Sequence, residues 1–213
     1  MNKRNYQKEL DQVIRMQEDK GKCPKLFLHS CCAPCSSYVL EYLSQYFEII
    51  VFYYNPNIFP ESEYANRVRE MKRLIQENEK NYQNKVAFLE GSYDPKVFYA
   101  MAKGMEDLPE RGERCYHCYE LRMREAAKVA VQMGADYFTT TLSISPYKNA
   151  DWINEIGERL AKEYGVSHLP SDFKKKNGYK RSIELSEQFG LYRQDYCGCI
   201  YSKLERERQK NER

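Results

Sequence analysis

The stretch Lys25-Leu-Phe-Leu-His-Ser-Cys-Cys-Ala-Pro-Cys35 places three cysteines within five residues, directly after a short apolar run. The run KLFLH is typical of a buried strand. Residues 33–46 then carry apolar side chains at helical spacing, at Val39, Leu40 and Leu43. The three cysteines are therefore predicted to lie in a turn between a strand and a helix.

The rest of the chain repeats this alternation of strand and helix. The sequence pattern predicts further strands at 48–54, 85–89, 136–142 and 167–169, and helices at 61–82, 94–102, 119–134, 150–164 and 180–189. Such alternation implies right-handed crossovers and a mostly parallel sheet with helices on both faces, so the predicted fold class is α/β. Ligands bind at the carboxyl ends of the strands in such sheets. The cysteines of the opening stretch, the loop 55–60 and the segment 143–147 should meet at that edge.

Bulk composition is that of an ordinary globular protein. The chain has 213 residues, of which 42% are hydrophobic and 31% charged, and a formal net charge of +3. Its first 22 residues are charged and contain no apolar signal-like segment, and the longest apolar run, 47–54, is much shorter than the roughly 20 residues that span a bilayer. We therefore expect a cytoplasmic protein with no membrane partner.

Two cysteine groups are candidates for a metal site. In a reducing compartment, cysteines are more often metal ligands or catalytic thiols than structural disulfides. Cys31, Cys32 and Cys35 form CC-x2-C, and Cys115 with Cys118 forms C-x2-C. Four thiolates from the two groups suit structural zinc or a [4Fe–4S] cluster. Neighbouring cysteines converge poorly on one small ion and favour the larger cluster, but zinc and metal-free thiol chemistry both stay open.

Cys197 and Cys199 form a third arrangement, C-x-C. A disulfide between them would close a very small ring and be strained, which suits a redox couple rather than a staple. The alternative is that this pair completes a metal site. Cys23 stands alone and is interpreted as an idle thiol.

Other polar residues near these groups are weaker candidates. His29 and His117 could ligate metal, donate a proton or only orient a ligand. The basic stretch 174–181, which contains Tyr179, could bind nucleic-acid phosphates or be a solvated face. No P-loop or dinucleotide-binding fingerprint occurs in the sequence.

Taken together, five segments resemble the cobalamin-independent epoxyqueuosine reductases of the QueH family: HSCCAPCSSYVLEYL, ERCYHCYELRM, TTTLSISPYKN, SDFKKKNGYKRS and YRQDYCGCIYS. The likeness runs from about Leu26 to Ser202. It implies a nucleotide α-hydrolase-like (HUP-like) layer fold and a two-electron removal of the epoxide oxygen from epoxyqueuosine at the wobble position of tRNA, the last step of queuosine synthesis. The implied partners are a tRNA with a GUN-type anticodon and an external electron donor.

The resemblance also assigns site residues. It matches Cys31, Cys32, Cys115 and Cys118 to the family's [4Fe–4S] ligands, and Cys197 with Cys199 to its redox-active disulfide. Cys35 and Asp172 are candidates for binding an additional iron, and Asp195 or Tyr196 for passing a proton.

The expected organisation is a helical extension at 1–24, where apolar residues recur at helical spacing from residue 6 to residue 19, then one α/β catalytic domain at 25–202 and a charged tail at 203–213. Two competing functions are a zinc-stabilised RNA-binding module without catalysis and a sulfur-transfer enzyme. The second would require an ATP phosphate loop, which the sequence lacks.

Overall fold

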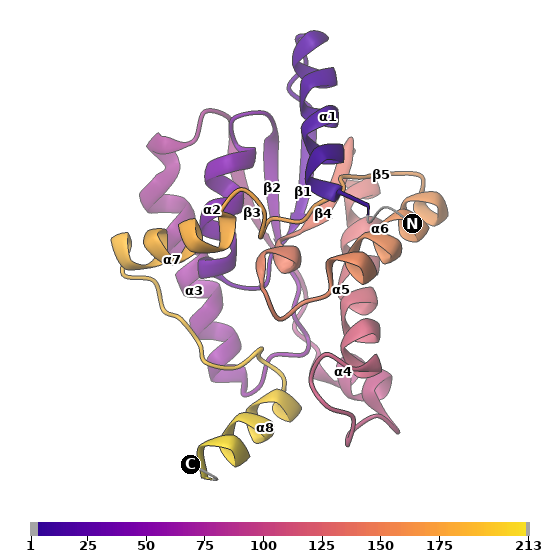
Figure 1. Cartoon of the computed structure of the whole chain (residues 1–213), viewed down its shortest axis with the longest axis vertical. Helices are drawn as coiled ribbons and strands as arrows, with labels where there is room; N and C mark the ends of the chain where they lie inside the picture. Colours follow the sequence, from indigo (N-terminus) through magenta and orange to yellow (C-terminus); the bar gives the residue numbers. More distant parts are fainter. Residues whose placement is uncertain (1–3, 212–213) are drawn as a thin grey trace.

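A five-stranded parallel sheet forms the centre of the molecule. The computed structural model describes residues 4–211. The strands are β1 (Lys25–His29), β2 (Glu48–Tyr53), β3 (Val86–Glu90), β4 (Tyr137–Thr140) and β5 (Ser167–His168). They lie in the order β3-β2-β1-β4-β5, and every pairing is parallel (Figure 1). The predicted α/β class is confirmed, and each predicted strand agrees with the structure to within two residues at either end.

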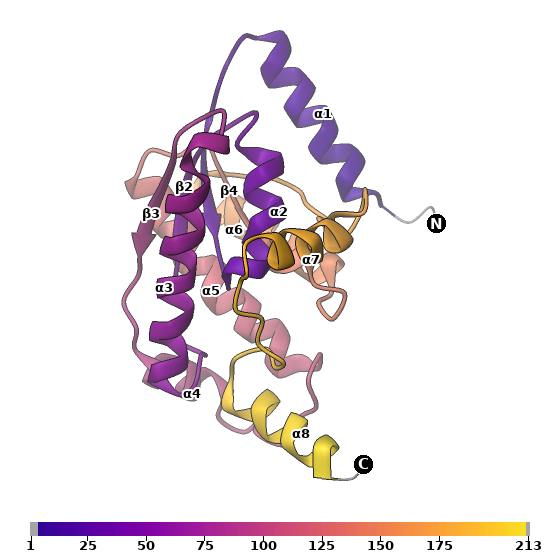
Figure 2. The ribbon, with the colours of Figure 1, turned by 90° about the vertical axis from the view of Figure 1, so that its left-hand side faces the viewer.

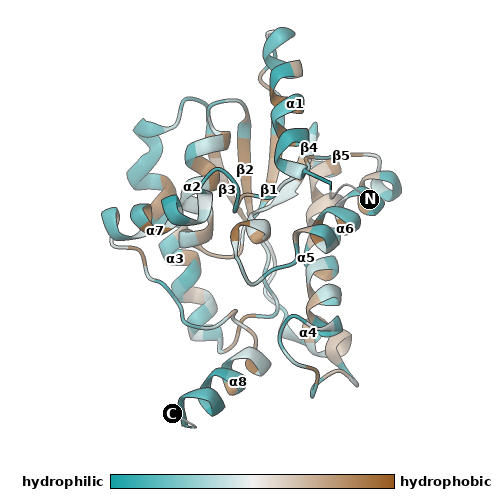
Figure 3. Ribbon diagram, in the orientation of Figure 1, coloured by the Kyte–Doolittle hydropathy of each residue, from teal (hydrophilic) through white to brown (hydrophobic). Residues whose placement is uncertain are grey.

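Helices cover both faces of the sheet. They are α1 (Tyr6–Asp19), α2 (Ala33–Leu43), α3 (Glu61–Asn78), α4 (Pro95–Ala102), α5 (Glu113–Gln132), α6 (Ala150–Tyr164), α7 (Gly178–Gln188) and α8 (Ile200–Asn211), with short 3₁₀ turns at Glu79–Asn81 and Thr141–Ile144. Helices α2, α3 and α7 lie on one side of the sheet and α5 and α6 on the other (Figures 1 and 2). Hydrophilic residues are frequent along α1, α3, α7 and α8 (Figure 3). Within residues 4–211, no helix is both long and apolar enough to cross a membrane.

Strand β1 belongs to both hydrophobic cores. Leu26 and Leu28 pack with α2 and α3, whereas Phe27 packs with α5, α6 and Phe138 of β4. Successive residues of a strand point to opposite faces, so a fully buried strand is apolar on both. Because β1 is flanked by β2 and β4, the strand order reverses beside it, and the turn after β1 lies at the crevice where such sheets bind ligands.

Helix α1 packs onto the core through the face that the periodicity predicted. Leu10 and Ile14 are buried in the core that includes α2. The Gln17 amide donates to the Tyr137 hydroxyl at 2.9 Å, and Asn5 caps the helix by accepting from the Lys8 amide at 3.1 Å. The N-terminal segment is therefore held against the sheet from Asn5 onward.

The start of α5 was predicted wrongly. The helix begins at Glu113 rather than at 119, so Cys115 and Cys118 lie in its first turns. Their spacing of three places both thiols on one helix face. The apolar stripe used for the prediction begins later because these first turns face a polar site rather than the core.

Candidate metal and redox site

The turn after β1 gathers three thiols. The Sγ atoms of Cys31, Cys32 and Cys35 all lie within 4.8 Å of one another, and those of Cys31 and Cys32 are 3.8 Å apart. Within residues 4–211, these three cysteines form the one group of three or more Cys, His, Asp or Glu side chains that is compact enough to hold a metal ion. The neighbouring cysteines thus converge more closely than we expected, because the chain turns from extended backbone at Cys32 into helix α2 at Ala33.

Hydrogen bonds within this group favour a thiolate at Cys32. A hydrogen bond with Cys31, which has the largest effect, and one with Cys35 lower the pKa of Cys32 well below its usual value. The nearby charge of Arg67 adds to the effect. The partner thiols shift the other way, because hydrogen bonds with Cys31 and Cys32 raise the pKa of Cys35 well above its usual value. Thiolate is the form that ligates metal.

The remaining site cysteines form a second group. Cys118 of α5 packs with Cys199 in a small buried cluster that includes Phe98 and Ala102. Burial, with a smaller contribution from charge at Cys197, raises the pKa of Cys115 to about 11. Burial likewise raises the pKa of Cys118 to about 12. No disulfide joins these cysteines in the described residues.

A half-buried lysine and a buried arginine interact with cysteines of both thiol groups. The Lys148 ammonium donates to Cys197 Sγ at 3.2 Å. Burial is the largest influence and opposes its charge, but negative charge at Cys197, Tyr119 and Cys31 together raises the pKa of Lys148 well above its usual value. Arg122, which is 2% exposed, donates to the Cys118 carbonyl at 3.1 Å and interacts electrostatically with Cys118, Cys197 and Cys31. Cys31, Cys35, Arg122, Lys148 and Cys197 all line one cavity of about 680 Å³.

Arg67 of α3 fixes the segment that carries the C-x-C pair. Its guanidinium donates to the Cys197 carbonyl at 3.2 Å and pairs with Glu63 at 2.7 Å, and it lies 5.4 Å from the Tyr196 ring centre. Gly198 has φ +131°, and a Cβ there would lie 3.1 Å from Arg67 Nη1. The position therefore requires glycine.

These residues fit a thiolate-bound metal cofactor. Thiolates favour zinc, copper(I) and iron–sulfur clusters, and such clusters carry net negative charge. Next to the thiols, the Nη2 atoms of Arg67 and Arg122 are buried without a hydrogen-bond partner in the described part of the chain. Two guanidinium groups, each with one unsatisfied nitrogen beside soft anionic ligands, match an anionic centre.

Several polar residues that were predicted as site candidates make contacts with other residues instead. His29 is fully buried between the Thr140 hydroxyl (2.8 Å) and the Tyr54 carbonyl (3.0 Å), and burial lowers its pKa to about 3, so it supports the turn rather than ligating metal. His117 is 3.7 Å from Glu113. Asp172 is paired with Lys174 at 2.8 Å and lies outside the thiol group.

The two proton-donor candidates also have other partners. Asp195 pairs with Lys210 at 2.5 Å, which lowers its pKa, and the Tyr196 hydroxyl donates to the Phe59 carbonyl at 2.7 Å. Sequence reasoning missed Lys148, Arg67 and Arg122. Only Lys148 left a usable signal, because it follows directly on the predicted segment 143–147 at the carboxyl edge.

Much of the basic stretch after β5 is neutralised by acidic neighbours. Lys176 pairs with Asp11 of α1 at 2.7 Å and Arg181 with Glu41 of α2 at 2.7 Å. Lys175 and Lys180 are exposed and have no ion pair within the part of the chain that the structure describes. These two lysines remain available to an anionic partner.

The fold and the site define an α/β protein with a thiol-rich site at the switch point of its sheet, where three cysteines could hold a metal ion. The family model "Epoxyqueuosine reductase QueH" matches residues 26–205. The relatives named epoxyqueuosine reductase QueH include one from Staphylococcus epidermidis, 44% identical over 94% of this chain and 85% of its own length, and one from Streptococcus pyogenes, 42% identical over 93% and 78%. Another, from Thermotoga maritima, is 34% identical over 85% of this chain and 91% of its own length. The chain belongs to the epoxyqueuosine reductase QueH family.

A structural likeness adds little to this. A solved NMN synthetase from Francisella tularensis covers 99% of this chain and 97% of its own, with 11% identity and a TM-score of 0.36. At that score the α/β assignment depends on the observed sheet alone.

Proposed function

We propose that this protein is an epoxyqueuosine reductase that converts epoxyqueuosine at the wobble position of tRNA into queuosine. Family membership gives the reaction, and the observation that carries it at the level of structure is one cavity lined from both thiol groups, by Cys31 and Cys35 and by Cys197. Removal of an epoxide oxygen breaks two C–O bonds, forms a C=C bond and releases water, which takes two electrons and two protons.

The Cys197–Cys199 pair has the right stoichiometry for this reaction. Oxidation of the dithiol to a disulfide releases two electrons and two protons, and an external donor must then reduce the disulfide for the next turnover. Lys148 holds Cys197 toward the cavity through the 3.2 Å hydrogen bond. Its ammonium stays charged and can stabilise negative charge on the departing oxygen.

We infer that Cys31, Cys32, Cys115 and Cys118 hold a [4Fe–4S] cluster, which leaves Cys35 for an additional iron. When bound, these groups would supply one-electron transfer and a Lewis acid. Arg67 and Arg122 would offset the negative charge of the thiolates, and His29 would keep the turn after β1 in place. The partners are a tRNA with a GUN-type anticodon and an electron donor of the cytoplasm.

Two measurements test the proposal. Anaerobically purified protein should be brown, contain iron and acid-labile sulfide, and bleach with dithionite. Cells lacking the protein should accumulate epoxyqueuosine in tRNA, and the wild type but not Cys197→Ser should restore queuosine. A colourless protein with one zinc and no effect on tRNA nucleosides would instead support a zinc-stabilised RNA-binding module.

A further inference from the structure

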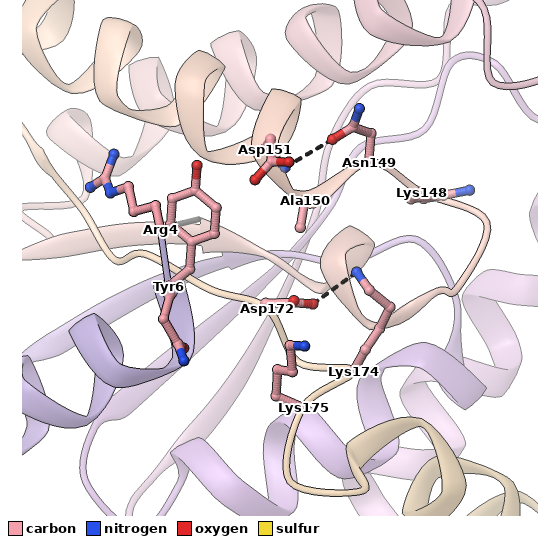
Figure 4. Close-up of a pocket in the computed structure, with 10 residues that line it drawn as sticks. Arg4, Tyr6, Lys148, Asn149, Ala150, Asp151, Asp172, Lys174 and Lys175 are labelled. Carbon is pink, nitrogen blue, oxygen red and sulfur yellow. Dashed lines mark hydrogen bonds and ion pairs between the residues drawn. The ribbon is translucent and has the colours of Figure 1, made fainter. Parts of the chain in front are cut away.

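A second cavity of about 570 Å³ adjoins the sulfur cavity. Three segments that are distant in sequence form its walls: Arg4–Tyr6 before and at the start of α1, Lys148–Asp151 at the start of α6, and the loop around Asp172–Lys175 (Figure 4). Lys148 lines both cavities. In Figure 4 its side chain points away from the other lining residues, in agreement with its hydrogen bond to Cys197 on the far side.

The carboxylates in this second cavity already have partners. Asp172 pairs with Lys174, which also donates to the Ser143 carbonyl at 2.9 Å, and the Tyr6 hydroxyl hydrogen-bonds Asp151. Lys175 is exposed at the rim, without an ion pair in the described residues. The cavity therefore presents an uncompensated cation to a ligand.

The N-terminal segment closes one side of the cavity in a fixed geometry. The Arg4 guanidinium lies 4.9 Å from the Tyr6 ring centre and is held by Glu9 at 2.7 Å and Glu158 at 2.6 Å. Tyr6 is 9% exposed, so its ring is a wall that is already in place before any ligand binds. A cavity of this volume suits one small molecule or one nucleotide.

We propose that this cavity binds the nucleotide that adjoins the wobble nucleotide in the substrate tRNA, with Lys175 at its phosphate and Tyr6 against its base or ribose. This inference rests on the proposed function, because the wobble base must enter the sulfur cavity and the next nucleotide is covalently linked to it. Bases of single-stranded loops are recognised in this way, splayed apart and set against aromatic and basic side chains. Arg4–Tyr6 lie outside residues 26–205, which the family model matches, so this RNA contact would come from the N-terminal segment.

Salt dependence tests the phosphate contact. Full-length, anaerobically prepared enzyme is titrated with a synthetic anticodon stem-loop RNA that carries epoxyqueuosine. For Lys175→Ala, the slope of log K against log salt should become shallower by about 0.7, the value for one single-strand phosphate contact. Lys162→Ala removes an exposed lysine near the opposite end of α6 and should leave the slope unchanged. An unchanged slope for Lys175→Ala would overturn the phosphate contact.

An abasic substitution tests the nucleotide itself. Stem-loops that lack the base on either side of the wobble position are compared with the intact RNA. The wild type should bind one of the two abasic stem-loops more weakly than the intact RNA. Tyr6→Ala should bind that abasic stem-loop and the intact RNA equally. Tyr6→Phe should behave as the wild type. If Tyr6→Ala and removal of the base lower the binding affinity independently, so that the two losses add, the inference is refuted. A wild type that binds but never reduces the intact stem-loop would refute the proposed function instead, and iron content and circular dichroism confirm that each variant is folded.

Discussion

Replacing Gly198 by alanine should release the redox segment from the site without unfolding the protein. At φ +131° an alanine is strained by about 1–3 kcal/mol. Its Cβ would also lie 3.1 Å from Arg67 Nη1 and 3.2 Å from Ile58 Cγ1, tighter than ordinary contact. Either the side chains of Arg67 and Ile58 must shift, or the segment that contains Gly198 must move.

The contacts that hold the segment decide between these outcomes. Besides the contact of Lys148 with the Cys197 thiol, three hydrogen bonds tie it to the rest of the chain: the Phe59 amide to the Gly198 carbonyl (2.8 Å), Arg67 Nη1 to the Cys197 carbonyl (3.2 Å) and the Tyr196 hydroxyl to the Phe59 carbonyl (2.7 Å). Each is worth about 1 kcal/mol. Because their sum is similar to the strain, the segment should shift and the core should stay folded.

The assay is single-turnover reduction of an epoxyqueuosine stem-loop by pre-reduced enzyme. If the strain must be overcome in each productive complex, the rate should fall about 5- to 150-fold, since 1.36 kcal/mol is tenfold in rate. The matched control is Gly190→Ala, because Gly190 also has positive φ (+54°) but has open space where the Cβ would be. That variant should lose about 2–4 °C in Tm for a strain of about 1 kcal/mol and keep its rate. Rates for Gly198→Ala within twofold of both the wild type and Gly190→Ala would refute the reasoning.

Three further predictions concern the pH dependence of stability, the metal and the redox pair. Burial lowers the pKa of His168 to about 3, so the unfolded chain binds the extra proton and stability falls as pH drops below about 6.5. Between pH 7 and pH 5 the loss should be about 2 kcal/mol smaller in His168→Gln than in the wild type, measured by urea unfolding, and an equal loss would contradict this. Cys32→Ala should abolish iron binding measured by metal analysis, whereas Cys23→Ala, at an exposed thiol, should not; retained iron in Cys32→Ala would exclude it as a ligand. Lys148→Met should slow alkylation of Cys197 by iodoacetamide about tenfold through loss of a charge-assisted hydrogen bond, as followed by peptide mass spectrometry, and an unchanged rate would show that the 3.2 Å contact has no chemical effect.

Local pattern was sufficient to predict the sheet and the positions of the thiols along the chain. The run at Lys25–His29 is apolar at every position except its ends, because β1 is buried on both faces, and the segments on either side alternate as a parallel sheet requires. Placing Cys31, Cys32 and Cys35 at the carboxyl edge then followed from topology alone. The zinc-module alternative could not be excluded by pattern, and family membership now favours the reductase.

The cations of the site could not be predicted in the same way. Arg67 and Arg122 occur on amphipathic helices among many charged residues, where an arginine is normally a surface residue. Their burial depends on partners brought together by the fold, such as the Cys197 carbonyl, 130 positions away from Arg67. The cavity beside α1 could not be predicted either, because Arg4–Tyr6 lie more than 140 residues from the other segments that line it.

The membership of β1 in both cores gives the two halves of the site different mechanical character. The thiols at Cys31 and Cys32 emerge directly from the most deeply buried strand, whereas Cys197 and Cys199 sit on a loop that leads into α8, where Ser202 is the one buried residue within Ile200–Asn211. Amide hydrogen exchange should therefore be slowest at Phe27–His29 and much faster around Cys197. A stiff side would suit the proposed metal centre, whose ligand geometry must not change with oxidation state, and a pliable side would suit the proposed redox pair, whose sulfurs must approach and separate.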